Sequence, residues 1–172
     1  MKRVVFLAFT VSLTAAVTVG QRAKSIEFIS YPAAVAKKAA KAIDFHNSPG
    51  ASTFRTRLRE AWKGEVNFAG RYIITGWGCG TGCSHSAIID AITGRVYFPD
   101  ELLGVGVSYG DIPDDYEVYT YRKNSRLLII RGTPGPDMEN SPERKQGTYY
   151  YEWRANRLKL IKFIPDKNSP NA

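Results

Sequence analysis

The 172-residue chain is poor in the residues on which most enzyme sites depend, with only two cysteines and two histidines. It contains no nucleophile elbow, no phosphate-binding glycine loop and no two-histidine helix motif. Outside its first twenty residues, it also has no apolar run long enough to span a membrane. These absences exclude the enzyme classes that such motifs define. The sequence indicates no cofactor and no metal.

The one long apolar run, Val4–Val19, follows Lys2 and Arg3 and is followed by small residues. This is the pattern of a secretory signal peptide. We expect residues 1–20 to be removed, leaving residues 21–172 as one periplasmic or secreted domain without stable membrane insertion. The alternative is an uncleaved anchor, but the run is short for a span of about 20 residues. Removal of the two basic residues lowers the formal charge from +8 to +6.

The remaining composition is that of a globular domain, 44% hydrophobic and 23% charged, with ten tyrosines that favour β-sheet. A basic helix face can indicate a nucleic-acid partner, and one is expected at Arg55, Arg57, Arg59 and Lys63. We interpret it as a solvated surface, because charged helix faces usually are and because export argues against nucleic acid. An envelope or extracellular protein is the more reasonable partner.

Two short helices are expected before the strands begin. Residues 30–50 place Val35, Ala39, Ile43 and His46 at spacings of four, four and three residues, which predicts one buried helical face. A second helix, capped by Ser52 or Thr53, would bury Phe54, Leu58 and Trp62.

Seven segments then have the β-branched and aromatic composition of strands. They are residues 71–75, 86–90, 95–98, 117–122, 127–131, 148–153 and 158–164. Alternation places Tyr149, Tyr151 and Trp153 on one face of the sixth. The sequence therefore predicts an α+β fold, with two short N-terminal helices packed on an antiparallel sheet of about seven strands built from hairpins. The tail after about residue 165 is expected to fray.

Two long loops interrupt the strands. Residues 100–117 carry six acidic side chains and no basic one, which suggests either an acidic surface loop or a calcium site, although the spacing matches no calcium-binding motif. Residues 132–147 contain three prolines, and a loop of that length is usually functional or disordered.

The most informative stretch lies between the first two predicted strands. Glycine occupies every second position from Gly76 to Gly82 in GWGCGTGC, so we expect the first strand to end near Thr75 and a compact loop to follow. The loop carries Cys79 and Cys83. The next hairpin should turn through Asp90–Gly94 with Gly94 left-handed.

The segments Asn67–Tyr72 (NFAGRY) and Trp77–Cys83 (WGCGTGC), a hairpin closing on Thr93-Gly94 and the tyrosine-rich Gly147–Trp153 resemble a family of small, uncharacterised secreted bacterial proteins. The similarity covers roughly residues 54–164, and the cysteine loop is its most specific part. Some members carry a second cysteine pair around the loop that here spans 133–146, where this chain has none. The resemblance implies fold class and compartment but no activity.

Three chemistries are open to the cysteine loop. Export favours a structural Cys79–Cys83 disulfide. His85 could instead activate Cys83 as a thiol, or both cysteines could bind a metal with His85 and His46. The disulfide is preferred, because redox pairs usually have two intervening residues at a helix start and a metal site would need a ligand from a remote segment.

The loop is also the best candidate site, because it combines covalent bracing with chemically capable side chains. We predict binding residues Trp77, Thr81, Ser84 and His85, with no catalytic residue assigned. The alternative for Trp77 is that its indole only fills the core. The preferred function is a disulfide-stapled, non-enzymatic binding or inhibitor protein. The alternative is a small exported hydrolase or thiol-dependent enzyme that uses His85 with Cys83 or a carboxylate.

Overall fold

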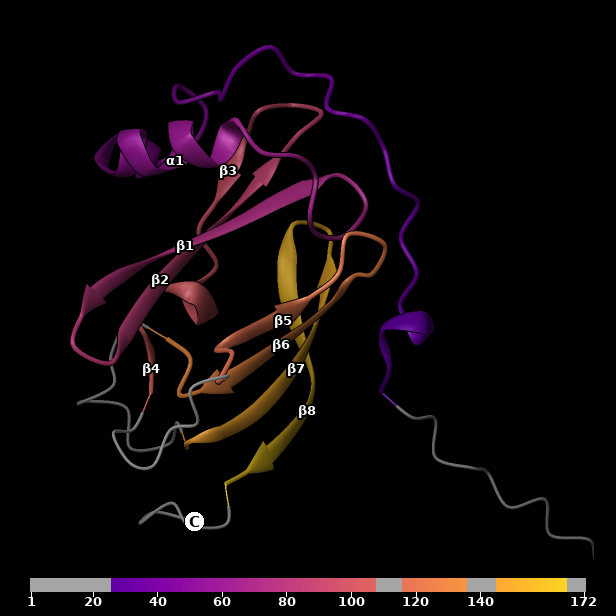
Figure 1. The fold of residues 1–172 in the computed structure, drawn as a ribbon, viewed down its shortest axis with the longest axis vertical. Helices are drawn as coiled ribbons and strands as arrows, with labels where there is room; N and C mark the ends of the chain where they lie inside the picture. Colours follow the sequence, from indigo (N-terminus) through magenta and orange to yellow (C-terminus); the bar gives the residue numbers. More distant parts are fainter. Residues whose placement is uncertain (1–25, 108–115, 136–144, 167–172) are drawn as a thin grey trace, which may run out of the picture.

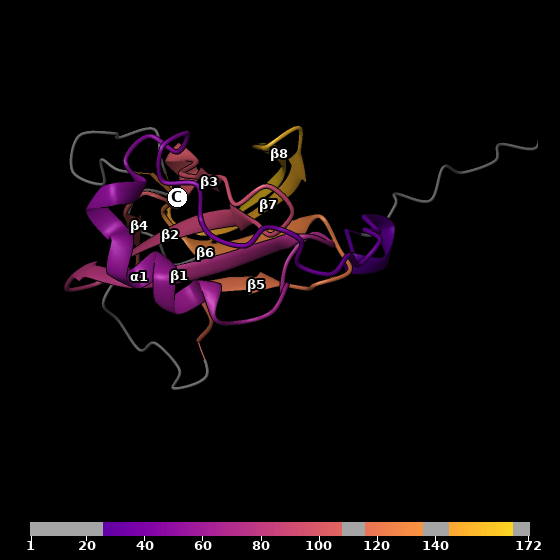
Figure 2. The ribbon, with the colours of Figure 1, turned by 90° about the horizontal axis from the view of Figure 1, so that it is seen from above.

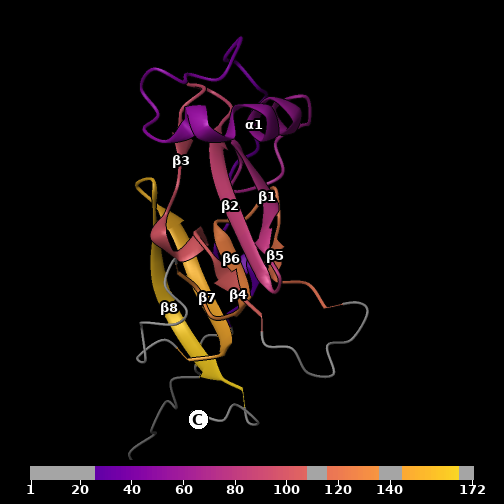
Figure 3. The same cartoon turned by 90° about the vertical axis from the view of Figure 1, so that its left-hand side faces the viewer.

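The computed structural model describes residues 26–107, 116–135 and 145–166. It shows two antiparallel four-stranded sheets and one α-helix arranged in three layers, with the helix on one face of the first sheet and the second sheet against the other face (Figures 1 and 3). The α+β class and the antiparallel hairpins agree with the sequence prediction. The single seven-stranded sheet does not.

The first sheet is the central layer. Its strands are β1 (Tyr72–Gly80), β2 (Cys83–Asp90) and β3 (Val96–Tyr97) in that order, and β4 (Val105–Gly106) also pairs with β2. Alternate side chains of β1 and β2 enter different cores. On the helix side lie Ile73, Ala87 and Ile89, and on the other side lie Tyr72, Ile74 and Ile88. Both faces of this sheet are therefore apolar and covered.

The second sheet runs in sequence order through β5 (Tyr119–Tyr121), β6 (Leu127–Gly132), β7 (Gly147–Arg154) and β8 (Arg157–Pro165). Burial alternates strictly along β7, so Tyr149, Tyr151 and Trp153 share one face, as predicted, and that face points into the core between the sheets. Trp153 packs edge-on against Tyr72 of β1, with ring centroids 5.4 Å apart. Aromatic packing of this kind joins the two sheets.

The helical layer consists of a 3-10 turn, Ala51–Phe54, that continues into α1 (Arg55–Trp62) and crosses obliquely above β1 and β2 (Figure 2). Leu58 is completely buried, and Phe54 and Trp62 are partly buried, so the predicted apolar stripe is confirmed. The basic residues of the stripe's opposite face are exposed, as expected for a solvated surface. No side-chain hydrogen bond caps the N-terminus of the 3-10 turn or of α1, so the predicted cap by Ser52 or Thr53 is wrong.

The predicted helix over residues 30–50 is also wrong. A 3-10 turn, Phe28–Ser30, leads instead into a non-helical segment over residues 31–50, which we call the strap. Ala36, Ala39 and Asp44 donate backbone hydrogen bonds to Gly70, Ala91 and Gly94 at 2.7–2.9 Å. A Cβ on Gly70 would lie 2.1 Å from the Ala34 oxygen, so glycine turns let the strap approach this closely.

Burial along the strap explains why the periodicity was misleading. Ile43 is buried, but Val35 is 54% exposed, and Ala39 and His46 are exposed as well. A single large apolar residue on the expected face cannot hold a helix against the sheet. The backbone pairing with three loops therefore outweighs the helix propensity of the alanines.

The sheet count differs for a related reason. A single sheet of seven strands with helices on one side would leave its other face in water. The apolar residues on both faces of β1 and β2 require a covering layer on each side, which the second sheet provides.

Several predictions fall on residues outside the described ranges. They concern the signal peptide at 1–20, most of the acidic loop at 108–115, the centre of the proline loop at 136–144 and the tail after 166. Within the ranges that the structure covers, no helix is long and apolar enough to cross a membrane.

Candidate functional site

The candidate site begins with the end of the β1–β2 hairpin that carries the two cysteines. The expected loop after Thr75 is instead strand, because pairing continues from Gly76↔Ser86 to Gly80↔Cys83 with a bulge between Gly78 and Gly80. Cross-strand pairing therefore overrides the low strand propensity of glycine. The hairpin extends past the partner strand β3, which pairs only at Ile88 and Ile89 (Figure 1).

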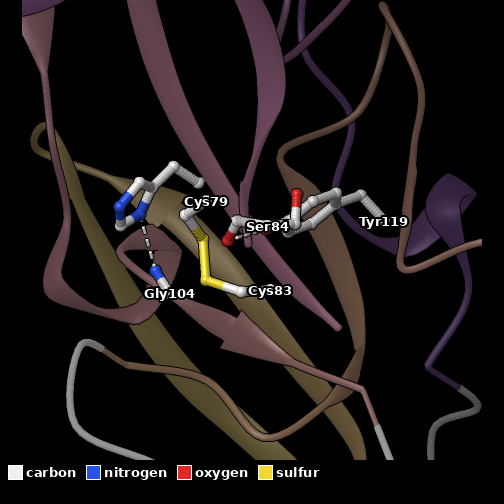
Figure 4. Close-up of a disulfide and its surroundings, with 6 residues drawn as sticks. Cys79, Cys83, Ser84, Gly104 and Tyr119 are labelled. Atoms are coloured by element: carbon white, nitrogen blue, oxygen red, sulfur yellow. Dashed lines mark hydrogen bonds between the residues drawn. A yellow bond between two sulfur atoms is a disulfide. The ribbon is translucent and has the colours of Figure 1, made fainter. Parts of the chain in front are cut away.

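A disulfide closes the hairpin end, as predicted. Cys79 and Cys83 are bonded, with a Cα–Cα distance of 5.2 Å (Figure 4). Both sulfur atoms are consumed by this bond. Neither is available as a thiol nucleophile or as a metal ligand, and His46 lies on the exposed strap rather than beside His85.

The four glycines of the hairpin differ in what they do. Of the four, Gly80 (φ 137°) and Gly82 (φ 65°) adopt the positive φ that glycine allows. A Cβ on Gly76 would lie 2.8 Å from the Ser86 hydroxyl, so this position has no room for a side chain. A Cβ on Gly78 would meet nothing within 4 Å.

Trp77 lies on the helix side of the hairpin, directly opposite His85 in the β1–β2 register. Its ring centroid is 4.7 Å from that of Phe54 and 6.4 Å from that of His85. Phe54 also contacts Phe98, with centroids 5.7 Å apart. Trp77 is partly buried and belongs to the edge of the helix-side core. It therefore anchors the hairpin under the helix and still presents part of its indole.

His85 has a defined tautomer. Its Nδ1 accepts a 2.8 Å hydrogen bond from the backbone N–H of Gly104, just before β4. A neutral imidazole in this arrangement carries its proton on Nε2 and offers a donor from that atom. The backbone N–H of Gly104 thus determines the orientation of the His85 ring and which of its nitrogens is the donor.

An open cleft of about 470 Å³ joins these parts. Its walls are the start of the helix, from Ser52 to Arg57, and the hairpin residues Trp77, Gly78, Cys79 and His85. These lining residues include no carboxylate, whereas Arg55 and Arg57 supply positive charge. Arg55 stacks over Phe45 at 4.2 Å, which holds its guanidinium at the rim. The cleft combines an aromatic surface with cationic and neutral donors, which suits a ligand with both apolar and anionic groups.

The structure brings together only two of the four predicted binding residues. Trp77 and His85 line the cleft. Thr81 lies exposed at the hairpin tip. Ser84 faces the other way with Gly78, and its carbonyl accepts a 3.3 Å hydrogen bond from Tyr119 of β5 (Figure 4).

Sequence reasoning missed the helix side of the cleft. Phe54 was assigned to the core, and Arg55 and Arg57 to a solvated face. Both descriptions are accurate, yet no local pattern shows that residues 52–57 lie against residues 77–85. The Gly104 contact to His85 is equally invisible, because a backbone donor leaves no signature in residue type.

A second cleft of about 520 Å³ lies where the strap passes the end of α1, and Lys37, Lys38, Lys63 and Lys123 border it. Lys38 is engaged there structurally. Its amine donates to the carbonyls of Trp62 and Gly64 at 2.5 and 2.7 Å and lies over the Trp62 ring. Lys63 pairs with Glu60 at 2.6 Å. The Lys38 contacts therefore hold the strap against the end of α1, and the second cleft is the weaker candidate for a binding site.

Comparison of this chain with protein-family models, with curated proteins and with solved structures gives no match. The family resemblance of the cysteine loop stays a prediction.

Proposed function

We propose that this protein is an exported, non-enzymatic binding or inhibitor protein that recognises an envelope or extracellular protein through the cleft between Ser52–Arg57 and the hairpin end. One observation carries the proposal. Trp77 and His85, chosen from the sequence for binding, face two exposed arginines across an open cleft that a disulfide braces. A rigid aromatic residue beside arginines is the usual composition of a binding hot spot.

Export is supported by the pattern of residues 1–20 and by the disulfide, which persists in oxidising compartments. The mature chain without Lys2 and Arg3 has a formal charge of +6, which favours an acidic partner. Binding by the cleft explains why the end of the hairpin is braced by a disulfide, since a preorganised surface loses less entropy on association.

The catalytic alternative has less support. A thiol-dependent enzyme would need Cys83 reduced, and that sulfur is in the disulfide. A hydrolase would need His85 to accept a proton on the cleft side, but its acceptor nitrogen is occupied by Gly104. The residues lining the cleft also lack a carboxylate that could replace it.

The test uses the mature protein as bait on the envelope and extracellular fractions of its own cell, followed by affinity measurement with the captured protein. We expect Trp77→Ala, and separately the pair Arg55→Ala/Arg57→Ala, to weaken binding at least about tenfold, the range of a hot-spot residue. Val35→Ala is the matched control, because it also removes an exposed apolar side chain but lies on the strap. Urea unfolding should show that each variant is folded.

The proposal fails if the cleft variants bind like the parent protein. It also fails if the captured protein is cleaved by the parent and not by His85→Ala, which would favour the enzyme.

A further inference from the structure

The outer edge of β1 has a feature that the cleft alone does not explain. In a regular antiparallel strand, the N–H and C=O groups of alternate residues point to opposite sides. Tyr72 directs its backbone groups away from β2, because its N–H donates to Phe68 and its carbonyl accepts from Asn67 and Phe68. Ile74 does the same, with both groups bound by the Asn67 side chain at 2.8 and 3.0 Å.

The next two residues in this alternation are Gly76 and Gly78. The β1–β2 register is regular as far as Gly78↔Ser84, so their N–H and C=O groups also point away from β2. In the part of the chain that the structure covers, β1 has no strand on this side and no hydrogen bond reaches these groups. The Asn67 side chain thus occupies the outward backbone groups of Ile74. Beyond Ile74, the outward groups of Gly76 and Gly78 have no partner among the described residues, and we call this segment the open edge.

The edge of the second sheet that β8 forms is constructed differently. Strand β8 carries Lys159 and Lys162, ends at Pro165 and faces a bulge at Tyr150/Tyr151. Lysines, proline and bulges are the features that prevent edge strands from pairing with other chains. The open segment of β1, Thr75–Gly80, has no charged residue and no proline. The β8 edge is therefore protected against pairing, and the open segment of β1 is not.

We propose that the open edge of β1 receives an extended acidic polypeptide segment as an added antiparallel or parallel strand. This inference rests on the proposed function and names the partner class. Gly76 and Gly78 offer two donors and two acceptors about 7 Å apart along the strand, the repeat that a partner backbone presents. Glycine within a strand often marks a place where another backbone approaches closely.

The positive charge beside the open edge favours an acidic partner strand. Gly78 lines the same cleft as Arg55 and Arg57, so a strand paired there borders both guanidinium groups. No ion pair involves either arginine among the described residues. An acidic side chain of the added strand would complement this charge, whereas a second copy of the chain would bring its own arginines to the same place.

The experiment is a selection of random ten-residue peptides displayed on phage against the mature protein. We expect enriched peptides to alternate β-branched or aromatic residues with others and to carry Asp or Glu. Gly78→Pro removes the outward N–H and should weaken these peptides at least about tenfold. Gly78→Ala is the comparison variant, because its Cβ enters open space and its N–H is kept, so it should weaken the peptides much less than Gly78→Pro does.

Several outcomes overturn the inference. They are enrichment of no peptide, equal binding of the peptides to Gly78→Pro and Gly78→Ala, or a concentration-dependent dimer that Gly78→Pro abolishes. The proposed function is judged separately. If Trp77→Ala loses the captured partner and Gly78→Pro keeps it, the cleft binds without the edge. If neither variant loses the partner, both proposals fail.

Discussion

Gly76 shows how one neighbour can fix the identity of a residue. Its backbone is ordinary strand, so conformational freedom does not explain the glycine. The Ser86 hydroxyl and the His85 carbonyl oxygen occupy the space of its missing Cβ, at 2.8 and 3.2 Å. Two residues further along, Gly78 meets nothing. Glycine is therefore required by packing at position 76, whereas at position 78 it leaves the backbone accessible.

This difference predicts unequal effects of the same substitution. Gly76→Ala should destabilise the protein by about 1–3 kcal/mol, because the added methyl group must displace Ser86 or the neighbouring strand. Gly78→Ala should change the free energy of unfolding by less than about 0.5 kcal/mol. Urea unfolding of both variants measures the two effects. Equal losses would mean that the backbone of the hairpin, and not Ser86, decides where glycine is needed.

A second prediction at this scale concerns alkaline stability. Burial raises the pKa of Tyr119 above its ordinary value of 10, although its hydrogen bond to Ser84 lowers it in part. Burial also raises the pKa of Tyr97 and of Tyr121. The folded state thus keeps these phenols neutral at a pH where the unfolded chain ionises them. Stability from this source is complete below pH 10 and is lost as pH rises through the raised pKa values.

Urea unfolding at a series of pH values from about 8 to 11 tests this sign. The free energy of unfolding should fall above pH 10, and the fall should be shallower in Tyr119→Phe. A curve for Tyr119→Phe that runs parallel to that of the parent protein would show that Tyr119 does not contribute.

At the scale of elements, the hairpin β1–β2 and the strap over residues 31–50 show where sequence patterns succeed and fail. The cysteine pair, the apolar stripe of α1 and the alternation of β7 were predictable, because each depends on neighbours close in sequence. The end of β1 and the strap were not. The end of β1 is decided by cross-strand pairing with Ser84–Ser86, which the low strand propensity of glycine conceals. The strap is decided by Gly70, Ala91 and Gly94, which are remote from it in sequence.

The disulfide closes a short loop, so its contribution to global stability should be small. On the chain-entropy model, closing so few residues stabilises the fold by about 2 kcal/mol. We expect the double variant Cys79→Ser/Cys83→Ser to lose no more than this in urea unfolding and to retain its circular dichroism spectrum. Binding at the cleft should weaken more, because the hairpin end loses its brace. A variant that unfolds outright would show that the disulfide holds the whole domain.

The strap and the helix make a matched pair for a stability test. Leu58 is completely buried between α1 and the first sheet, and Val35 is largely exposed on the strap. Leu58→Ala should cost about 2–5 kcal/mol, whereas Val35→Ala should cost less than about 0.5 kcal/mol. A large loss for Val35→Ala in urea unfolding would favour the helix that the periodicity of residues 30–50 predicted.

At the scale of the whole molecule, the sequence predicted the class but not the arrangement of layers. Hairpin spacing identifies which strands are consecutive, and it does not tell whether hairpins share a sheet. The decisive information is the apolar composition of both faces of β2, at Ala87 and Ile89 on one side and Ile88 on the other. A strand of this kind must be covered twice. The first sheet is therefore central, and its far end carries the cleft and the open edge.

Amide hydrogen exchange along β1, followed by NMR on the free mature protein, tests this account most directly. Thr75 and Trp77 point toward β2, so their amides should be protected on the order of a hundredfold or more, and Asn67 should protect the amide of Ile74. The amides of Gly76 and Gly78 should exchange near the rate of an unfolded chain. Protection of both glycine amides comparable to that of Thr75 would contradict the account, because the edge would already be occupied.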